Sequence, residues 1–167
     1  MSFKNLHTIS GNIVVYLLFF ASASFLWGCK QGIVYDDTRS FKNKGWNVED
    51  VPEFKVNIDD TISRFDFLVN FRHNNDYPYS NLFLFIHTYY PQGEVTHDTV
   101  EFLLALPSGE WLGDGFGKLI TDRILLRENM IFPQKGEYVF RFEQAMRAET
   151  LEGVEDFGIT IKKRQDN

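Results

Sequence analysis

The sequence predicts an all-β protein, built as an antiparallel sandwich of two sheets with about eight strands. Short segments in which apolar and polar residues alternate recur along the chain. Turn-forming groups such as Pro91-Gln92-Gly93 and Pro133-Gln134-Lys135-Gly136 separate these segments at near-regular spacing. No long helical pattern occurs after Cys29. A jelly-roll strand order is compatible with this pattern, and the sequence does not choose among the strand orders.

The alternation marks the strands one after another. A first strand is expected near Ile33, and Trp46 is expected to begin the compact part of the chain. The residues expected to face the core from the later strands are Phe54, Val56 and Ile58; Phe65, Phe67, Val69 and Phe71; Val100, Phe102, Leu104 and Leu106; Tyr138, Phe140 and Phe142; and Phe157, Ile159 and Ile161.

Three segments depart from simple alternation. Leu82 to Ile86 is apolar at every position, which predicts a central strand covered on both faces. Ile124 to Phe132 is expected to form a strand, although its pattern is less regular. Glu143 to Leu151 is compatible with a short helix or with a strand end followed by a loop.

The first 28 residues have the parts of an export signal. Lys4 gives a positive charge, an uncharged apolar run extends from Ile13 to Trp27, and small residues lie near its end. Leu26-Trp27-Gly28-Cys29 follows and contains the only cysteine of the chain. This tetrapeptide resembles a bacterial lipobox, in spite of the bulky Trp27. A signal peptidase would then cut between Gly28 and Cys29, and acyl chains would be attached to the sulfur.

An uncleaved single-pass anchor over residues 9–28 is the other interpretation of this region. The uncharged run is shorter than the about 20 residues that a membrane span needs, so the lipobox is preferred. The expected organisation is therefore a signal peptide at 1–28 that is removed, a lipidated tether with the first strand at 29–45, the sandwich domain at 46–163 and a polar tail at 164–167.

Composition excludes several classes of protein. Lys4 is the only charged residue before Cys29, so the mature chain has 16 basic and 23 acidic residues and a formal net charge of −7. A negative domain repels nucleic acids and anionic lipid head groups. An aromatic content of 16% argues against disorder. With its single thiol acylated, the domain would contain no disulfide and would depend on its core for stability.

No catalytic, metal or cofactor signature occurs in the sequence. His73, His87 and His97 stand in no metal-ligand spacing, and no Gly-x-Ser-x-Gly motif is present. The adjacent carboxylates Asp59-Asp60 and Glu155-Asp156 lie at turns, and neighbouring strand residues point in opposite directions. Carboxylates distant in sequence can still meet, which leaves glycoside cleavage open. The sequence nevertheless predicts a protein that is not an enzyme and has no metal or cofactor.

Two surface features are hypotheses of function. The glycine-dense stretch 113–117 lacks the helix and Lys-Ser/Thr ending of a nucleotide loop, so it predicts a tight turn. A functional alternative is an exposed aromatic binding surface formed by Tyr77, Tyr79, Trp111 and Phe116.

Thr61 and Thr99 are candidate O-glycosylation sites. Asp60-Thr61-Ile62 and Asp98-Thr99-Val100 are similar to the Asp-Ser/Thr-apolar motif at which Bacteroidetes glycosylate exported proteins. Each is only three residues long, and a threonine that begins a strand is the alternative interpretation.

The mature chain also resembles the GldH family of gliding-motility lipoproteins from Bacteroidetes. The lipobox stands where a member of this family has it. The segments that carry the resemblance are, in order, Tyr77-Pro78-Tyr79-Ser80-Asn81-Leu82, Asp98-Thr99-Val100-Glu101-Phe102, Pro107-Ser108-Gly109, Trp111-Leu112-Gly113, Gly115, Gly117, Phe132-Pro133-Gln134-Lys135-Gly136-Glu137-Tyr138 and Glu143-Gln144-Ala145-Met146-Arg147.

This resemblance implies a non-enzymatic component of the gliding machinery or of its linked secretion system, acting through contacts with other envelope proteins. Lys30 replaces the aspartate that retains many lipoproteins in the inner membrane, and no acidic export tag follows. The expected location is therefore the periplasmic face of the outer membrane. The alternative is a lipid-anchored carbohydrate-binding module that holds glycan through Trp46, Trp111, Tyr77 or Tyr79. A small envelope hydrolase is a third hypothesis.

Overall fold

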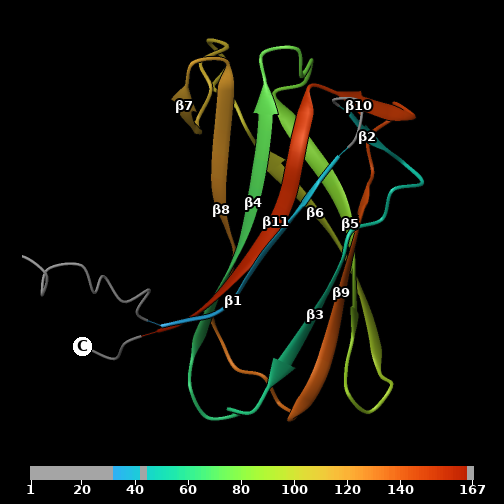
Figure 1. The fold of residues 1–167 in the computed structure, drawn as a ribbon, viewed down its shortest axis with the longest axis vertical. Coiled ribbons are helices and arrows are strands. Elements are labelled where there is room, and N and C mark those ends of the chain that lie inside the picture. The colour runs from blue at the N-terminus through green and yellow to red at the C-terminus, as the bar shows by residue number, and fades with distance from the viewer. Residues whose placement is uncertain (1–31, 42–44, 165–167) are drawn as a thin grey trace, which may run out of the picture. The chain divides into compact units, whose positions relative to one another are not determined.

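The computed structural model describes residues 32–41 and 45–164. Within these ranges the chain forms β-strands and no helix (Figure 1), which confirms the all-β prediction. No helix in the described residues is long and apolar enough to cross a membrane. The strands are β1 (Ile33–Ser40), β2 (Gly45–Asn47), β3 (Glu53–Ile58), β4 (Phe65–Asn74), β5 (Asn81–Tyr89), β6 (Val95–Leu103), β7 (Asp114–Phe116), β8 (Leu119–Met130), β9 (Gly136–Gln144), β10 (Thr150–Glu152) and β11 (Val154–Lys163).

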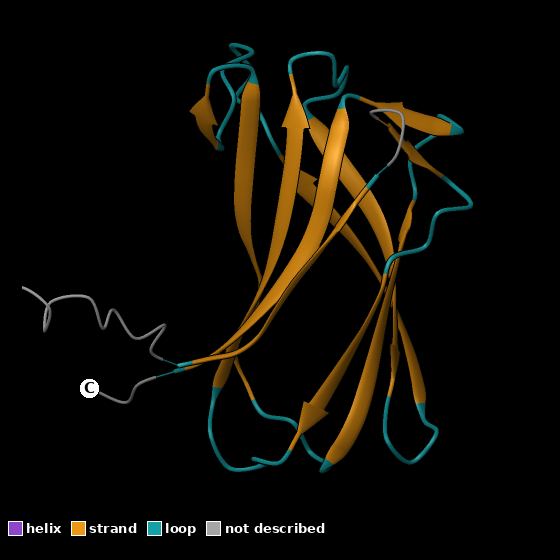
Figure 2. Ribbon diagram, in the orientation of Figure 1, coloured by secondary structure: helices purple, strands orange, loops and turns teal. Residues whose placement is uncertain are grey.

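The strands form two main antiparallel sheets and one small one (Figure 2). The five-stranded sheet has the order β1-β11-β4-β8-β7, and the four-stranded sheet has the order β3-β9-β5-β6. Strands β10 and β2 pair with each other at one end. The strands in excess of the predicted number are the three-residue strands β2, β7 and β10, which are too short for alternation to reveal them.

Aromatic rings join the two main sheets. Phe67 of β4 meets Phe140 of β9 edge to face, with ring centroids 4.9 Å apart. Phe157 of β11 lies 4.9 Å from Phe142 and 5.0 Å from Trp46. All five side chains are buried. The ring of Trp46 ties the small sheet to the sandwich core. The compact part begins before Trp46, however, because β1 belongs to the five-stranded sheet and Phe41 is buried against the Trp46 ring.

The predicted inner faces of β3, β4, β9 and β11 are confirmed, because every core residue expected there is buried. Leu106 is an exception on the segment after β6, with 44% of its surface exposed. The prediction for Leu82 to Ile86 was right that the strand is central, since β5 lies between β9 and β6, and wrong that both of its faces are covered. Leu82, Leu84 and Ile86 face the core, but Phe85 points to the outside and is 44% exposed. The outer face of β5 is thus not covered by any described element.

The Glu143–Leu151 segment forms no helix. Strand β9 continues to Gln144, a loop follows, and β10 begins at Thr150. The side-chain amide of Gln144 organises the loop, since it donates to the Ala148 carbonyl at 2.8 Å and its oxygen accepts the Met146 N–H at 2.9 Å. The second alternative stated for this segment, a strand end and loop, is the correct one.

Strand β1 is an edge strand that runs antiparallel to β11 along almost its whole length. Its outward residues are mostly polar and exposed, which suits a sheet edge. Gly158 of β11 permits the close pairing, because a Cβ added there would lie 2.5 Å from the Asp37 carbonyl oxygen and from Thr38 Oγ1. Any larger residue would push β1 away from the sheet.

We expect Phe157→Ala to lower the free energy of unfolding by about 3–5 kcal/mol, because the cavity would open where three sheets meet. Equilibrium unfolding in denaturant measures this change. The control is Leu103→Ala, which removes a side chain that is 67% exposed and should change stability by less than about 0.5 kcal/mol. Similar losses for the two variants would contradict the role assigned to Phe157.

Candidate functional site

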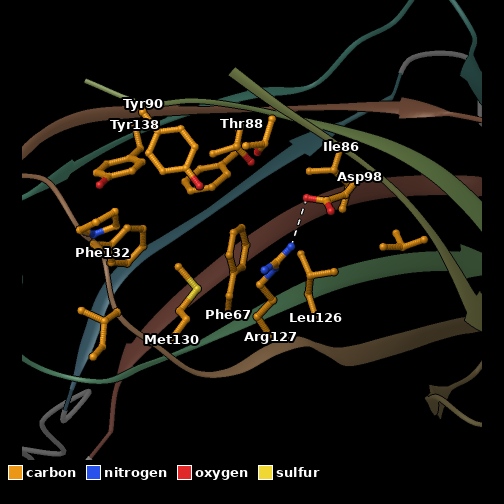
Figure 3. A pocket seen from close by; sticks show the side chains of 15 residues that line it. Phe67, Ile86, Thr88, Tyr90, Asp98, Leu126, Arg127, Met130, Phe132 and Tyr138 are labelled. Carbon is orange, nitrogen blue, oxygen red and sulfur yellow. Dashed lines mark hydrogen bonds and ion pairs between the residues drawn. The ribbon is translucent and has the colours of Figure 1, made fainter. Parts of the chain in front are cut away.

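The described residues enclose a pocket between the two main sheets, at the side where β6 and β8 face each other. Its volume is about 340 Å³. Figure 3 shows side chains from both sheets pointing into it. The lining is mostly aromatic and aliphatic: Phe67, Ile86, Thr88, Tyr90, Thr96, Asp98, Val100, Leu126, Arg127, Met130, Ile131, Phe132, Pro133, Tyr138 and Phe140. A concave apolar site of this size suits a small apolar group.

Two bulges in β8 shape the wall of this pocket. Leu126 has no partner in β4, because Phe67 pairs with Arg127 and Leu68 pairs with Leu125. A second register shift follows between Arg127 and Met130. An extra residue in one strand bends it and redirects its side chains. The bulges thus account for the turning of Leu126, Arg127 and Met130 towards the pocket.

Asn129 holds the second bulge in place. Its φ of 59° makes it the one non-glycine residue with positive φ among the described residues. Asparagine tolerates this left-handed conformation better than most residues do. Its backbone N–H donates to Asp66 Oδ1 at 3.0 Å, which fixes the bulge to the neighbouring strand.

Arg127 and Asp98 form an ion pair across the mouth of the pocket. Arg127 Nη2 lies 3.1 Å from Asp98 Oδ2, and the pair joins β8 of one sheet to β6 of the other. Both side chains are substantially exposed, at 59% and 41%. Such a pair contributes at most about 1 kcal/mol, so little energy is needed to open this contact.

Tyr138 is a buried residue of the pocket lining. Its hydroxyl donates to the Gln134 carbonyl and accepts the Gln134 N–H, both at 3.0 Å. Burial raises the pKa of Tyr138, while the hydrogen bond with the Gln134 backbone acts in the opposite direction. The Tyr138 hydroxyl is therefore neutral, and its hydrogen bonds are made with the backbone of Gln134. Since Asp98 and Arg127 pair with each other, the lining favours binding of an apolar group over acid–base chemistry.

The outer face of the four-stranded sheet carries a second feature, the aromatic row, which we define as Phe83, Phe85, His87 and Tyr89 of β5. Leu103 of β6 extends its apolar surface and is 67% exposed. His87 pairs across the strands with His97, and their Nδ1 atoms are in hydrogen-bond contact. On its other side, His87 Nε2 lies 3.2 Å from Glu143 Oε1.

The histidines form no metal site in the part of the chain that the structure describes. No group of three or more His, Cys, Asp or Glu side chains is placed to hold an ion there. His73 is fully buried, with Nδ1 3.0 Å from the Asn74 carbonyl and Nε2 3.3 Å from Asp122 Oδ2. This pair is a contact within the core at the end of the sandwich.

The predicted aromatic binding surface is corrected by the structure. Tyr77 is buried, and its hydroxyl donates to the Asn81 carbonyl at 2.8 Å. Trp111 is partly buried with its ring centroid 4.5 Å from that of His73, and Tyr79 lies against Tyr77. These rings close the end of the sandwich over His73. The side chain of Phe116 is outside the described residues, so its part in the hypothesis is untested.

The remaining predicted sites divide into two groups. Gly28 and Cys29 lie outside the described residues. Thr61 is half-buried in the β3–β4 loop, and Thr99 is exposed on β6 opposite Phe85. Sequence reasoning missed the pocket and the ion pair at its mouth. The irregular alternation of 124–132 was the one local signal, because each bulge adds a residue that interrupts the period.

The model of the GldH lipoprotein family matches residues 33–161, which include nearly all of the described domain. The chain belongs to this family. The chain is 37% identical over 142 residues to "Gliding motility lipoprotein GldH homolog" of Christiangramia forsetii, covering 81% of this chain and 86% of that protein. It is 31% identical over 150 residues to "Gliding motility lipoprotein GldH" of Flavobacterium johnsoniae, covering 86% and 92%.

Among solved structures, the VP2 subviral particle of infectious bursal disease virus aligns with 80% of this chain and 40% of its own. The TM-score is 0.21 and the sequence identity 11%. A likeness this low carries no argument about fold or function.

We expect an apolar fluorescent dye with a sulfonate group, anilinonaphthalene sulfonate, to bind the native protein in the pocket near Arg127. Val100→Trp should fill the pocket and reduce the dye fluorescence several-fold. Leu103→Trp adds the same ring on the outside and serves as the control. Fluorescence titration of folded protein measures both variants. Equal dye binding by the two would mean that the pocket does not accept apolar ligands.

Proposed function

We propose that the protein is a lipid-anchored, non-enzymatic component of the gliding-motility machinery, or of the secretion system linked to it. The observation that carries the proposal is its similarity, over most of the chain, to two proteins named as gliding motility lipoproteins. The Leu26-Trp27-Gly28-Cys29 sequence supports the anchor, with Cys29 as the acylated residue.

The periplasmic face of the outer membrane is the proposed location. Lys30 follows the proposed acylated cysteine, and Lys30-Gln31-Gly32 contains no acidic residue. An aspartate directly after the cysteine would favour the inner membrane, and an acidic cluster would favour the cell surface. The sequence therefore lacks both of the features that direct a lipoprotein elsewhere.

Contacts with other proteins are the proposed mode of action. The aromatic row and the neighbouring Leu103 expose apolar area to water on the outer face of the four-stranded sheet. Phe85 is 44% exposed and Leu103 is 67% exposed. Exposed apolar patches of this kind are typical of surfaces that bind another protein. Aromatic side chains on a rigid strand are typical of the buried centre of protein interfaces. Thr99, Glu143 and His97 on the neighbouring strands surround the row with polar groups. This arrangement supports an interface with an apolar centre and a polar rim.

The glycan-binding alternative has less support. Trp46 and Tyr77 bury their rings in the core, so they are not available to stack on a sugar. Trp111 and Tyr79 are partly buried and pack against His73 and Tyr77. The four rings form no exposed strip.

We expect deletion of the gene in its native host to reduce colony spreading and protein secretion. Restoration with the wild type should recover both, and restoration with Cys29→Ala should recover neither, because the protein would leave the membrane fraction. Intact mass of the native protein and membrane fractionation check the anchor directly.

Two outcomes would contradict parts of this proposal. If deletion changes neither spreading nor secretion, the motility role is wrong for this organism. If Cys29→Ala restores both fully, the anchor is not needed for the role.

We expect Phe85→Asp to reduce spreading in the restored strain while the protein stays folded and in the membrane fraction. A charge at the centre of an apolar contact costs far more than one on an open surface. Leu125→Asp is the matched control, since Leu125 is 50% exposed on the other sheet. If the Phe85→Asp strain and the control strain spread equally, the aromatic row is not the contact surface.

A further inference from the structure

The described chain begins at the end of the sandwich where β11 ends. The Gly32 carbonyl accepts the Lys163 N–H at 2.6 Å, so the start of β1 lies beside the end of β11. The next residue, Arg164, donates its N–H to the Arg64 carbonyl at 2.8 Å. The start of the described chain and the β3–β4 loop, residues 59–64, therefore belong to the same end (Figure 1).

Covalent geometry limits how far this end can be from the proposed anchor. Cys29 precedes Gly32 by three residues, and three residues of fully extended chain reach at most about 11 Å. Whatever the conformation of those residues, Gly32 would lie within that distance of the Cys29 backbone, whose sulfur would carry the lipid. We call this end of the sandwich the anchor end.

The loops of the anchor end expose apolar side chains. Ile62, in the β3–β4 loop, is 86% exposed, and Ile131, just after β8, is 46% exposed. The two loops are linked through the core, because Phe65 pairs with Met130 and its ring meets that of Phe132 at 5.3 Å. Exposing an isoleucine side chain to water costs free energy, and burying it in the interface of a bilayer would recover that free energy.

Asp60 fixes the loop that carries Ile62. Its Oδ1 accepts the N–H groups of Ile62 at 3.0 Å and Ser63 at 2.9 Å. Its Oδ2 lies 2.8 Å from Lys163 Nζ. The hydrogen bond from Lys163, followed by those from Ser63 and Ile62, holds the pKa of Asp60 well below its usual range. The loop therefore presents Ile62 from a preformed turn.

Charge differs between the two ends of the sandwich. At the anchor end, acidic and basic residues nearly balance: Asp59, Asp60, Asp66, Glu94, Glu128 and Glu137 against Arg64, Lys135, Lys162, Lys163 and Arg164. The loops at the opposite end have a surplus of acidic residues: Asp76, Glu110, Asp114, Glu149 and Glu152, against Lys118 and Arg147. An anionic membrane surface would repel the opposite end and not the anchor end.

We propose that the anchor end docks on the bilayer, with Ile62 inserted at the membrane interface and Ile131 beside it. Arg64 and Lys162, both exposed, then lie at the level of the lipid phosphates. The inference rests on the proposed acylation of Cys29. It fixes the orientation of the domain, whereas acylation alone would leave the domain free to rotate on a short tether. A sugar attached to Thr61, next to Ile62, is incompatible with this docking.

The test uses the full lipidated protein, in which acylation blocks the thiol of Cys29. Ile62→Cys then carries the one free thiol, which is labelled with a polarity-sensitive dye. The labelled protein is placed in vesicles of phosphatidylethanolamine with a minority of phosphatidylglycerol. Leu112→Cys is the matched control, because Leu112 is 52% exposed in a loop at the opposite end. Ile131→Cys gives a second reading from the anchor end.

We expect lipids brominated in their acyl chains to quench the dye at position 62 roughly twofold more than the dye at position 112. Iodide in the water should show the reverse order. Equal access of iodide to both dyes, in protein that is acylated and bound to the vesicles, would overturn the docking and leave the anchor intact. If the intact mass shows no acyl group, the anchor and the docking both fail. An added sugar on Thr61 would overturn the docking alone.

Discussion

The contact on which the fold depends most is the meeting of rings around Phe157. This one side chain of β11 touches Trp46 of the small sheet and Phe54 and Phe142 of the four-stranded sheet. The only cysteine of the chain lies before the described domain, so no disulfide holds the domain together. Burial of large rings replaces it. The sheets are joined closely at this side, and at the other side, where β6 and β8 face each other, the core is left with a pocket.

Much of the sandwich could be predicted because a half-buried strand repeats every two residues. Phe65, Phe67 and Val69 are apolar and buried for that reason, and so are Tyr138 and Phe140. A strand that is apolar at every position gives no such information. Leu82 to Ile86 has the same composition whether its outer face is covered or exposed, and here Phe85 is exposed. The bulges of β8 were equally hidden, since an extra residue only makes the alternation irregular.

The candidate sites show the same limit. The lipobox around Cys29 is a local motif, so the sequence alone indicates it. The pocket is built from residues as far apart as Phe67 and Phe140, which no spacing rule connects. Tyr77 and Trp111 stand among turn residues, where aromatic side chains suggest a binding surface, but both pack around His73. The sequence shows that these aromatic side chains are present, but only the fold shows whether they are exposed or packed against other residues.

The pairing of β1 with β11 has a mechanical consequence. The chain enters the domain at Ile33, and β1 runs from there towards the opposite end beside β11. A load between an N-terminal tether and a partner at the opposite end would pull β1 along its own axis. The hydrogen bonds of an antiparallel ladder lie across that axis, so they resist together in shear and do not open one at a time. The narrow space above Gly158 keeps β1 against the sheet along this line. The domain is thus connected at its mechanically strong edge.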